Sequence, residues 1–189
     1  MRHNGEVYIR KGLWTVKEFY DVVKKLPANA EIALHFRFTS SGKTLKTMCH
    51  PFSLEKNDVK RMRGKVRASM MHNGTIKNLC FRGESSDTYY LADMLSKYHP
   101  SEIEQDRFID MVDTIVSGSR VLIFTGKTTF MFGDWKEANG CHYSNDGYKK
   151  EYTSGFNSHS SRKQDSYGNY YLEFDRGSGS YVRKDSLFD

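Results

Sequence analysis

The tripeptide His72-Asn73-Gly74 is a segment of this sequence suited to hold an oxyanion. Asparagine and glycine tolerate the left-handed backbone conformation, so the tripeptide predicts a tight turn at the end of a strand. Such a turn directs backbone N–H groups outward. Together with the Asn73 side-chain amide they could form a cluster of donors facing a negative charge. An ordinary hairpin turn would use the same residues.

An acidic residue, Asp87, follows a short loop later, at a predicted helix start. Ser85 and Ser86 have short polar side chains that can accept hydrogen bonds from the unpaired N–H groups of a first helical turn. Upstream, residues 68–71 form a short apolar run that predicts the strand before the turn. The helix is indicated by apolar residues at helical spacing, Tyr90, Leu91, Met94 and Leu95. The sequence thus predicts a donor-rich turn followed by an acidic helix N-terminus; an ordinary helix cap is the alternative.

The charge is unevenly placed along the 189 residues, whose net charge is +6. Residues 143–189 contain seven Lys or Arg and seven Asp or Glu, so residues 1–142 carry the whole excess. Part of it lies in a basic cluster after Phe52, which could contact phosphates or an acidic protein, or could be a solvated loop. The basic cluster comprises Lys56, Lys60, Arg61, Arg63, Lys65 and Arg67.

No apolar run approaches the roughly 20 residues that span a bilayer, and the N-terminal residues lack the apolar core of a signal peptide. We therefore expect a cytoplasmic protein with no membrane partner. The three cysteines, Cys49, Cys80 and Cys141, form no even-numbered framework and are expected to be reduced thiols. Two of them precede a histidine, but the spacings typical of metal sites are missing, so neither a metal nor a cofactor is expected.

Hydrophobic periodicity predicts an alternation of helices and strands. Thr15 and Glu18 suit a capping box, and the residues after them mark one apolar helical face up to Pro27: Val16, Phe19, Tyr20, Val23 and Leu26. Strands are predicted over residues 6–10 after an Asn-Gly turn, 31–38, 44–49, 120–124 and 128–132, a loop over the basic cluster, and a further helix from Pro100 to Gly118. This order indicates an α+β fold with sheet and helices segregated in layers.

The composition changes near residue 146, which divides the chain into a body, residues 1–145, and a tail, residues 146–189. The tail is rich in Tyr, Ser and Gly with few aliphatic residues, so it is predicted to be flexible or ordered by a partner. Residues 170–174 could add an edge strand. The mixture of tyrosine with lysine and arginine also suits stacking on RNA or single-stranded DNA.

Four separated segments occur in a recognisable order: His35 to Gly42, Cys49 to Phe52, Met71 to Gly74, and Ser86 to Thr88. Together they resemble the class II glutamine amidotransferase domain, a member of the N-terminal-nucleophile (Ntn) hydrolases. The likeness is closest to small stand-alone versions carried by bacteriophages and covers roughly Gly5 to Asn145. The resemblance implies a four-layer αββα sandwich with a glutamine site between its sheets, in the host cytoplasm if the protein is phage-encoded.

The resemblance also implies roles for individual residues. The guanidinium of Arg37 would pair with the α-carboxylate of the substrate, because a planar fork suits a carboxylate. Asn73 and Gly74 would form the oxyanion hole, and Asp87 would take the α-amino group. The family strand usually continues Ala-Thr-His-Gly, and here Ser40 keeps a hydroxyl. The residues assigned to the glutamine site are Arg37, Ser40, His72, Asn73, Gly74 and Asp87.

The nucleophile of this family is a cysteine at the mature N-terminus, whose own α-amine acts as the base. This chain begins with Met1, so the resemblance implies an N-terminally truncated, degenerate domain that keeps a pocket for a glutamine-like amide without its nucleophile. Cys49, next to His50, is an alternative thiol. A second hypothesis is a pseudoenzyme that binds a host protein or nucleic acid through the basic cluster and the tail. The charge alone would also suit a plain nucleic-acid binder.

Overall fold

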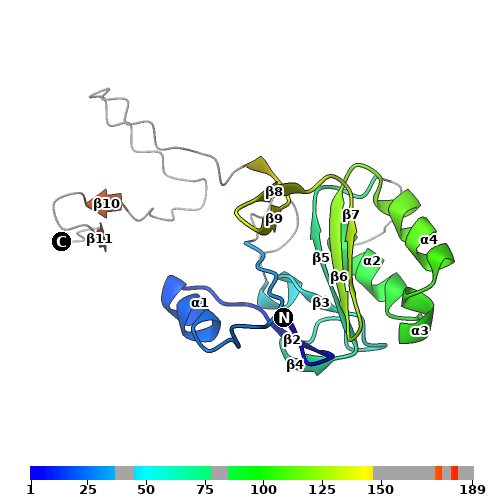
Figure 1. Ribbon diagram of the computed structural model, residues 1–189, viewed down its shortest axis with the longest axis horizontal. Coiled ribbons are helices and arrows are strands. Elements are labelled where there is room, and N and C mark those ends of the chain that lie inside the picture. The colour runs from blue at the N-terminus through cyan, green and yellow to red at the C-terminus, as the bar shows by residue number, and fades with distance from the viewer. Residues whose placement is uncertain (37–44, 78–84, 147–172, 176–179, 183–189) are drawn as a thin grey trace. The chain divides into compact units, whose positions relative to one another are not determined.

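The computed structural model describes residues 1–36, 45–77, 85–146, 173–175 and 180–182. The chain divides into two compact units, Met1–Lys150 and Glu151–Asp189. The first unit is a mixed fold of helices and several antiparallel sheets, which confirms the predicted α+β class (Figure 1). None of the helices in the described ranges has the length and apolar character needed to cross a bilayer.

A four-stranded antiparallel sheet, in the order β3-β5-β6-β7, forms the centre of the first unit. Its strands are β3 (Phe52–Ser53), β5 (Ala68–Asn73), β6 (Arg120–Thr125) and β7 (Thr129–Phe132). β5 is the strand predicted before the His-Asn-Gly turn, and β6 with β7 is the predicted hairpin. The first five residues of β5 are all buried, because other layers cover both faces of this strand.

A three-stranded antiparallel sheet, in the order β1-β2-β4, packs against one face of the four-stranded sheet. Its strands are β1 (Arg2–His3), β2 (Glu6–Arg10) and β4 (Arg63–Val66). Asn4 and Gly5 both have positive φ and make the tight turn that Asn-Gly predicts between β1 and β2. A small core between the two sheets contains Val7, Ile9, Val66 and Phe124.

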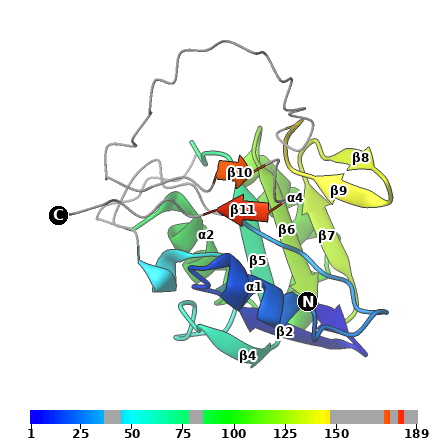
Figure 2. The same cartoon turned by 90° about the vertical axis from the view of Figure 1, so that its left-hand side faces the viewer.

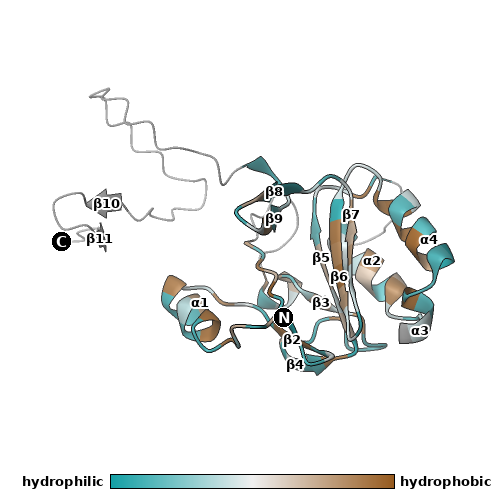
Figure 3. Cartoon of the chain, viewed as in Figure 1, coloured by the Kyte–Doolittle hydropathy of each residue, from teal (hydrophilic) through white to brown (hydrophobic). Residues whose placement is uncertain are grey.

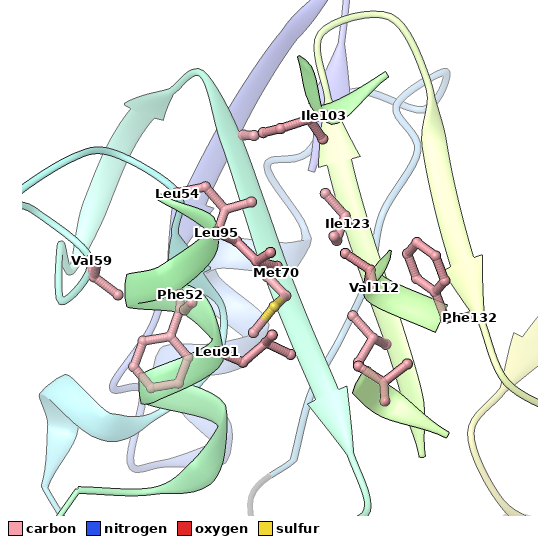
Figure 4. Packing of buried hydrophobic residues seen from close by; sticks show 14 of the residues in the cluster. Phe52, Leu54, Val59, Met70, Leu91, Leu95, Ile103, Val112, Ile123 and Phe132 are labelled. Carbon is pink, nitrogen blue, oxygen red and sulfur yellow. The ribbon is translucent and has the colours of Figure 1, made fainter. Parts of the chain in front are cut away.

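Three helices cover the other face of the four-stranded sheet (Figure 1). Helix α2 (Asp87–Leu95) begins as predicted, with the Ser86 hydroxyl accepting a hydrogen bond from the Tyr89 N–H. The main hydrophobic core lies between these helices and the sheet (Figure 4). Its largest fully buried side chains include Phe52, Leu54, Met70, Leu91, Leu95, Ile103, Val112 and Ile123.

The single helix predicted from Pro100 is wrong in one respect, because the chain forms two helices, α3 (Pro100–Ile103) and α4 (Asp106–Val116). The break falls at Glu104. Its carboxylate accepts hydrogen bonds from Thr125 Oγ1 at 3.3 Å and from Lys127 Nζ at 2.9 Å. These contacts tie the point of the break to the β6–β7 hairpin.

Helix α1 (Val16–Val23) lies on the side away from α2, and Figure 2 views the unit from this side. The predicted capping box is present: Thr15 Oγ1 accepts from the Glu18 N–H, and the Glu18 carboxylate accepts from the Thr15 N–H. Apolar residues lie on this helix (Figure 3), yet none of its residues is buried, and Val16 is 71% exposed. The predicted apolar face therefore exists but lacks a closely packed partner.

Two predicted strands are wrong over their described residues. Residues 31–36 form only an isolated bridge, between Glu31 and Arg2, because the two-residue strand β1 offers no further partner. Residues 45–49 contain the short 3-10 helix η1 (Lys46–Met48) in place of a strand. The loop predicted over the basic cluster is also wrong at its end, where β4 pairs with β2.

Two further hairpins follow β7. β8 (Lys136–Ala138) and β9 (Cys141–Tyr143) are joined by Asn139 and Gly140, both with positive φ. In the second unit, β10 (Glu173–Asp175) pairs antiparallel with β11 (Ser180–Val182). Residues 173 and 174 of the predicted edge strand belong to β10, and residues 170–172 lie outside the described residues.

Candidate functional site

Three histidines connect three of the four segments that carry the family resemblance. His35 Nε2 donates to the His72 carbonyl oxygen at 3.1 Å, and the rings of His35 and His50 lie 4.0 Å apart between centroids. The His72 N–H donates to His50 Nδ1 at 3.4 Å. A carbonyl only accepts, so Nε2 of His35 carries a proton, whereas Nδ1 of His50, which accepts, does not. The backbone of His72 is therefore held by two imidazole rings.

The fourth segment, Ser86 to Thr88, is connected to the three histidines through the side chain of His72. His72 Nδ1 and Thr88 Oγ1 are 2.7 Å apart, and the Thr88 hydroxyl donates to Asp87 Oδ1 at 3.3 Å. A hydroxyl has one proton, so His72 Nδ1–H is the donor to Thr88, which leaves Nε2 without a proton in the neutral ring. Burial lowers the pKa of His72 and the Asp87 charge opposes this shift, so the ring is neutral at pH 7. Nε2 of His72 is buried and has no hydrogen-bond partner among the described residues.

Asp87 is the first residue of α2 and is half-buried. Its Oδ2 accepts from the Ile76 N–H at 2.9 Å, and its Oδ1 accepts from the Thr88 N–H at 2.7 Å as well as from the Thr88 hydroxyl. A carboxylate has about four lone-pair positions, so, counting the described residues, one position on Oδ2 remains for an incoming donor such as an ammonium group. The N-terminus of α2 also stabilises the negative charge.

The turn after β5 has hydrogen-bond donors that lack a partner among the residues that the structure describes. Asn73 Nδ2 donates to Ser144 Oγ at 2.8 Å, which leaves its second amide hydrogen available. Gly74 has φ of +133°, and a Cβ at this position would lie 2.7 Å from Ser119 Oγ, so glycine is required. Ser119 Oγ in turn donates to the Thr75 carbonyl oxygen at 3.0 Å. The Gly74 N–H has no partner within the described part of the chain. Asn73 and Gly74 can therefore both donate to an anion.

Four of the six residues assigned to the glutamine site lie at the end of β5 and the start of α2: His72, Asn73, Gly74 and Asp87. The hydrogen bonds through Thr88 connect His72 to Asp87. The other two assigned residues, Arg37 and Ser40, lie outside the described residues, as does Cys80.

Half of the basic cluster is paired with acidic side chains. Arg61 Nε lies 2.6 Å from Asp58 Oδ2, Lys65 pairs with Glu6, and Arg67 Nε lies 3.7 Å from Glu55 Oε2. Arg67 also donates to the carbonyl oxygens of Leu54 and Ser96. Lys60 lies over the ring of Tyr89, with Nζ 4.4 Å from its centroid. These contacts reduce the positive field that a nucleic acid would meet.

A buried lysine, Lys11, lies at the border of the main core. Its Nζ donates to the Thr47 carbonyl oxygen at 3.0 Å and lies 4.5 Å from the centroid of Phe52. Burial lowers the pKa of Lys11 to about 8. Cys49 is half-buried, with its Sγ 3.8 Å from the Leu45 carbonyl oxygen. Within the described ranges, His, Cys, Asp and Glu side chains form no group of three or more that could hold a metal ion.

Sequence reasoning assigned no role to Thr88, Ser119 or Ser144. Thr88 follows the acidic helix start directly, so a hydroxyl there could have been considered as a link to a neighbouring histidine. Ser119 and Ser144 contact the turn across 44 and 71 residues, respectively. No local signal marks such partners. The pairing of β5 with β6 brings Ser119 beside the turn, because Arg120 is opposite Asn73, whereas Ser144 directly follows β9.

Comparison of the chain with protein-family models, curated proteins and solved structures found no match.

Proposed function

We propose that the first unit is a class II glutamine amidotransferase-like domain of the small bacteriophage type, with a pocket for the amide of an α-amino acid such as glutamine. The supporting observation is a continuous series of contacts through His35, His50, His72, Thr88 and Asp87. These contacts join all four segments on which the resemblance rests. The order of layers, helices then two sheets then α1, is compatible with an αββα sandwich.

In this proposal the two ends of the amino acid are held by opposite charges. The free position on Asp87 Oδ2 accepts from the α-ammonium group, and the guanidinium of Arg37 pairs with the α-carboxylate. The Asn73 amide and the Gly74 N–H donate to the side-chain carbonyl oxygen, where negative charge would develop during attack on the amide. The proposal concerns binding and polarisation of the amide, and no residue of the site is assigned as its nucleophile.

The alternative function, a pseudoenzyme that binds a host protein or nucleic acid through the basic cluster and the tail, has weaker support from the basic cluster. Three of the six basic residues are already neutralised by Asp58, Glu6 and Glu55. Exposed ion pairs of this kind contribute little to stability, but they lower the net charge that a phosphate backbone would attract.

The test is titration of the full chain with L-glutamine in a calorimeter. We expect saturable binding that Asp87→Asn weakens by about tenfold or more, because loss of a charged partner leaves the ammonium group unpaired in a half-buried site. Asn73→Ala should have a smaller effect on binding, since it removes one neutral donor. D-Glutamine, which cannot satisfy the ammonium, carboxylate and amide contacts together, should bind more weakly.

Asp93→Asn is the matched control, because it makes the same charge change on the same helix, at a residue paired with exposed Lys97. It should leave the affinity for L-glutamine unchanged. Equal weakening by Asp87→Asn and Asp93→Asn would contradict the proposed pocket, as would the failure of the wild-type chain to bind L-glutamine at millimolar concentration. Circular dichroism of each variant checks that the fold is retained.

A further inference from the structure

The hydrogen bond from Asn73 Nδ2 to Ser144 Oγ, 2.8 Å long, joins the turn after β5 to a residue 71 positions away in the chain. Ser144 directly follows β9 and is half-buried. The bond is made by the same amide group of Asn73 that would donate to a bound substrate. Its effect on the direction of that group therefore decides whether Ser144 belongs to the site.

The carboxamide of Asn73 needs an outside partner to fix its direction. The torsion that rotates an asparagine carboxamide has a broad, roughly two-fold profile, so the side chain alone does not choose between presenting its NH2 group and presenting its oxygen. The Gly74 N–H differs, because it belongs to the backbone, and the close approach of Gly74 to Ser119 holds the backbone there. Of the two donors in the turn, only the one on Asn73 can be rotated away.

Ser144 supplies this partner. Its Oγ accepts one hydrogen of Nδ2, and the two N–H bonds of an amide diverge within one plane, so the direction of the second hydrogen is fixed as well. The residue opposite Asn73 on β6 cannot replace Ser144, because Arg120 has donors only, and its Nε donates to the Asp134 carbonyl oxygen at 3.1 Å. Among the described residues, Ser144 is thus the partner of the Asn73 side chain.

The segment after β7 determines where Ser144 lies. Trp135 Nε1 donates to the Phe132 carbonyl oxygen at 2.9 Å, and Gly133 has φ of +79° in a turn where a Cβ would overlap the Ser119 carbonyl oxygen. This turn leads into the β8–β9 hairpin, which lies near one end of the four-stranded sheet (Figure 1). The hairpin returns the chain, and Ser144 follows its last strand. Ser144 is therefore presented to Asn73 from an ordered element.

We propose that Ser144 is a positioning residue of the oxyanion hole, whose hydroxyl holds the Asn73 carboxamide with one N–H directed at the side-chain carbonyl oxygen of the bound amide. This inference rests on the proposed glutamine pocket and adds the end of the β8–β9 hairpin to it. Without Ser144, the carboxamide can rotate and present its own oxygen, which would repel the negative charge that develops on the substrate.

The first measurement needs no ligand. In the NMR spectrum of the full chain, the signal of the Asn73 Nδ2 hydrogen that is bonded to Ser144 should lie downfield of the other. Ser144→Ala should move this signal towards the position of a solvated asparagine amide. Ser144→Thr keeps a hydroxyl at the same place and should retain the wild-type signal.

The second measurement uses L-glutamine labelled with carbon-13 at the amide carbonyl, followed by infrared spectroscopy. Binding to the wild type should lower the carbonyl stretching frequency, and Ser144→Ala should lose about half of this shift, because one of the two donors is no longer aligned. Ser144→Ala should also weaken binding by about twofold to tenfold, the effect of one neutral hydrogen bond. Ser144→Thr should retain both the shift and the affinity.

A double-mutant cycle separates positioning from a general structural role. In the Asn73→Ala background, Ser144→Ala should weaken binding no further, because Ser144 acts through Asn73. Thr129→Val is the control, since it removes another half-buried hydroxyl, which donates to Glu31 towards the end of the sheet away from Asn73. It should change neither the Asn73 signals nor the affinity.

The inference is overturned if the Asn73 signals are the same in the wild type and Ser144→Ala, or if Ser144→Ala weakens binding equally with and without Asn73. A wild-type chain that shows the bonded Asn73 signal but does not bind L-glutamine would contradict the proposed pocket, while the orientation of Asn73 by Ser144 would stand.

Discussion

The α2 side and the α1 side of the first unit both contain amphipathic sequence, but only the α2 side is closely packed. Leu91 and Leu95 of α2 are completely buried against the four-stranded sheet, whereas Ile32 and Leu34 on the α1 side are 41% and 51% exposed. Both sides have apolar residues with regular spacing. The difference lies in whether a neighbouring element meets the apolar face, which periodicity alone does not reveal.

The largest contrast between the two sides should appear in stability. Leu95→Ala leaves a cavity in the main core, and we expect a loss of about 2–5 kcal/mol in the free energy of unfolding. Leu34→Ala removes the same atoms from a half-exposed position and should cost less than about 1 kcal/mol. Urea denaturation of both variants measures the difference. Similar losses would mean that the α1 side is as well packed as the α2 side.

The elements that the sequence predicts correctly have their partners nearby in the chain or carry strong local signals. The hairpin of β6 and β7 needs only a short turn, and the capping boxes and caps at Thr15 and Ser86 depend on residues within one helical turn. The strand predicted at residues 31–38 fails over its described part because a strand needs a neighbour, and the two-residue strand β1 pairs with this segment only through the bridge from Arg2 to Glu31. An alternation of apolar and polar residues indicates that a segment can form a strand, but it gives no information about the strand with which the segment would pair.

In the candidate site, too, some features could be predicted from the sequence and others could not. The acidic helix start at Asp87 and the glycine turn at Gly74 could be predicted, because each follows from local backbone chemistry. The connection of His72 to Thr88, and the support of its backbone by His35 and His50, could not be predicted. Those contacts depend on how β5 packs against segments far away in sequence.

Lys11 lies between the two sides, because it lines a cavity on the α1 side and contacts Phe52 of the main core. Its pKa falls from 10.5 to about 8 by burial, so below pH 8 Lys11 keeps its charge in the folded state at a cost in stability. This shift corresponds to a penalty of roughly 3 kcal/mol. Lys11→Met should therefore raise the free energy of unfolding at pH 7 by about 1–3 kcal/mol, part of the gain being lost with the donor to Thr47.

The pH dependence separates this cause from a simple gain in packing. As pH rises above 8, Lys11 loses its proton in the folded state and the penalty declines, so the advantage of Lys11→Met should shrink between pH 7 and pH 9.5. An advantage that stays constant over this range would contradict the charge explanation. Lys56→Met, at an exposed lysine, is the control and should change stability by less than about 0.5 kcal/mol at either pH.

His72, on the buried strand between the two sides, should produce the smallest of the three effects. Burial lowers its folded-state pKa below the usual value near 6.5, so the unfolded chain binds more protons and stability falls as pH decreases from about 7 to 5. His72→Gln removes this titration, and its Tm should therefore drop less than that of the wild type between pH 7.5 and pH 5.5. His142→Gln, at an exposed histidine of β9, should retain the wild-type drop. Equal drops in wild type and His72→Gln would show that burial of the neutral imidazole contributes nothing to the acid sensitivity of the fold.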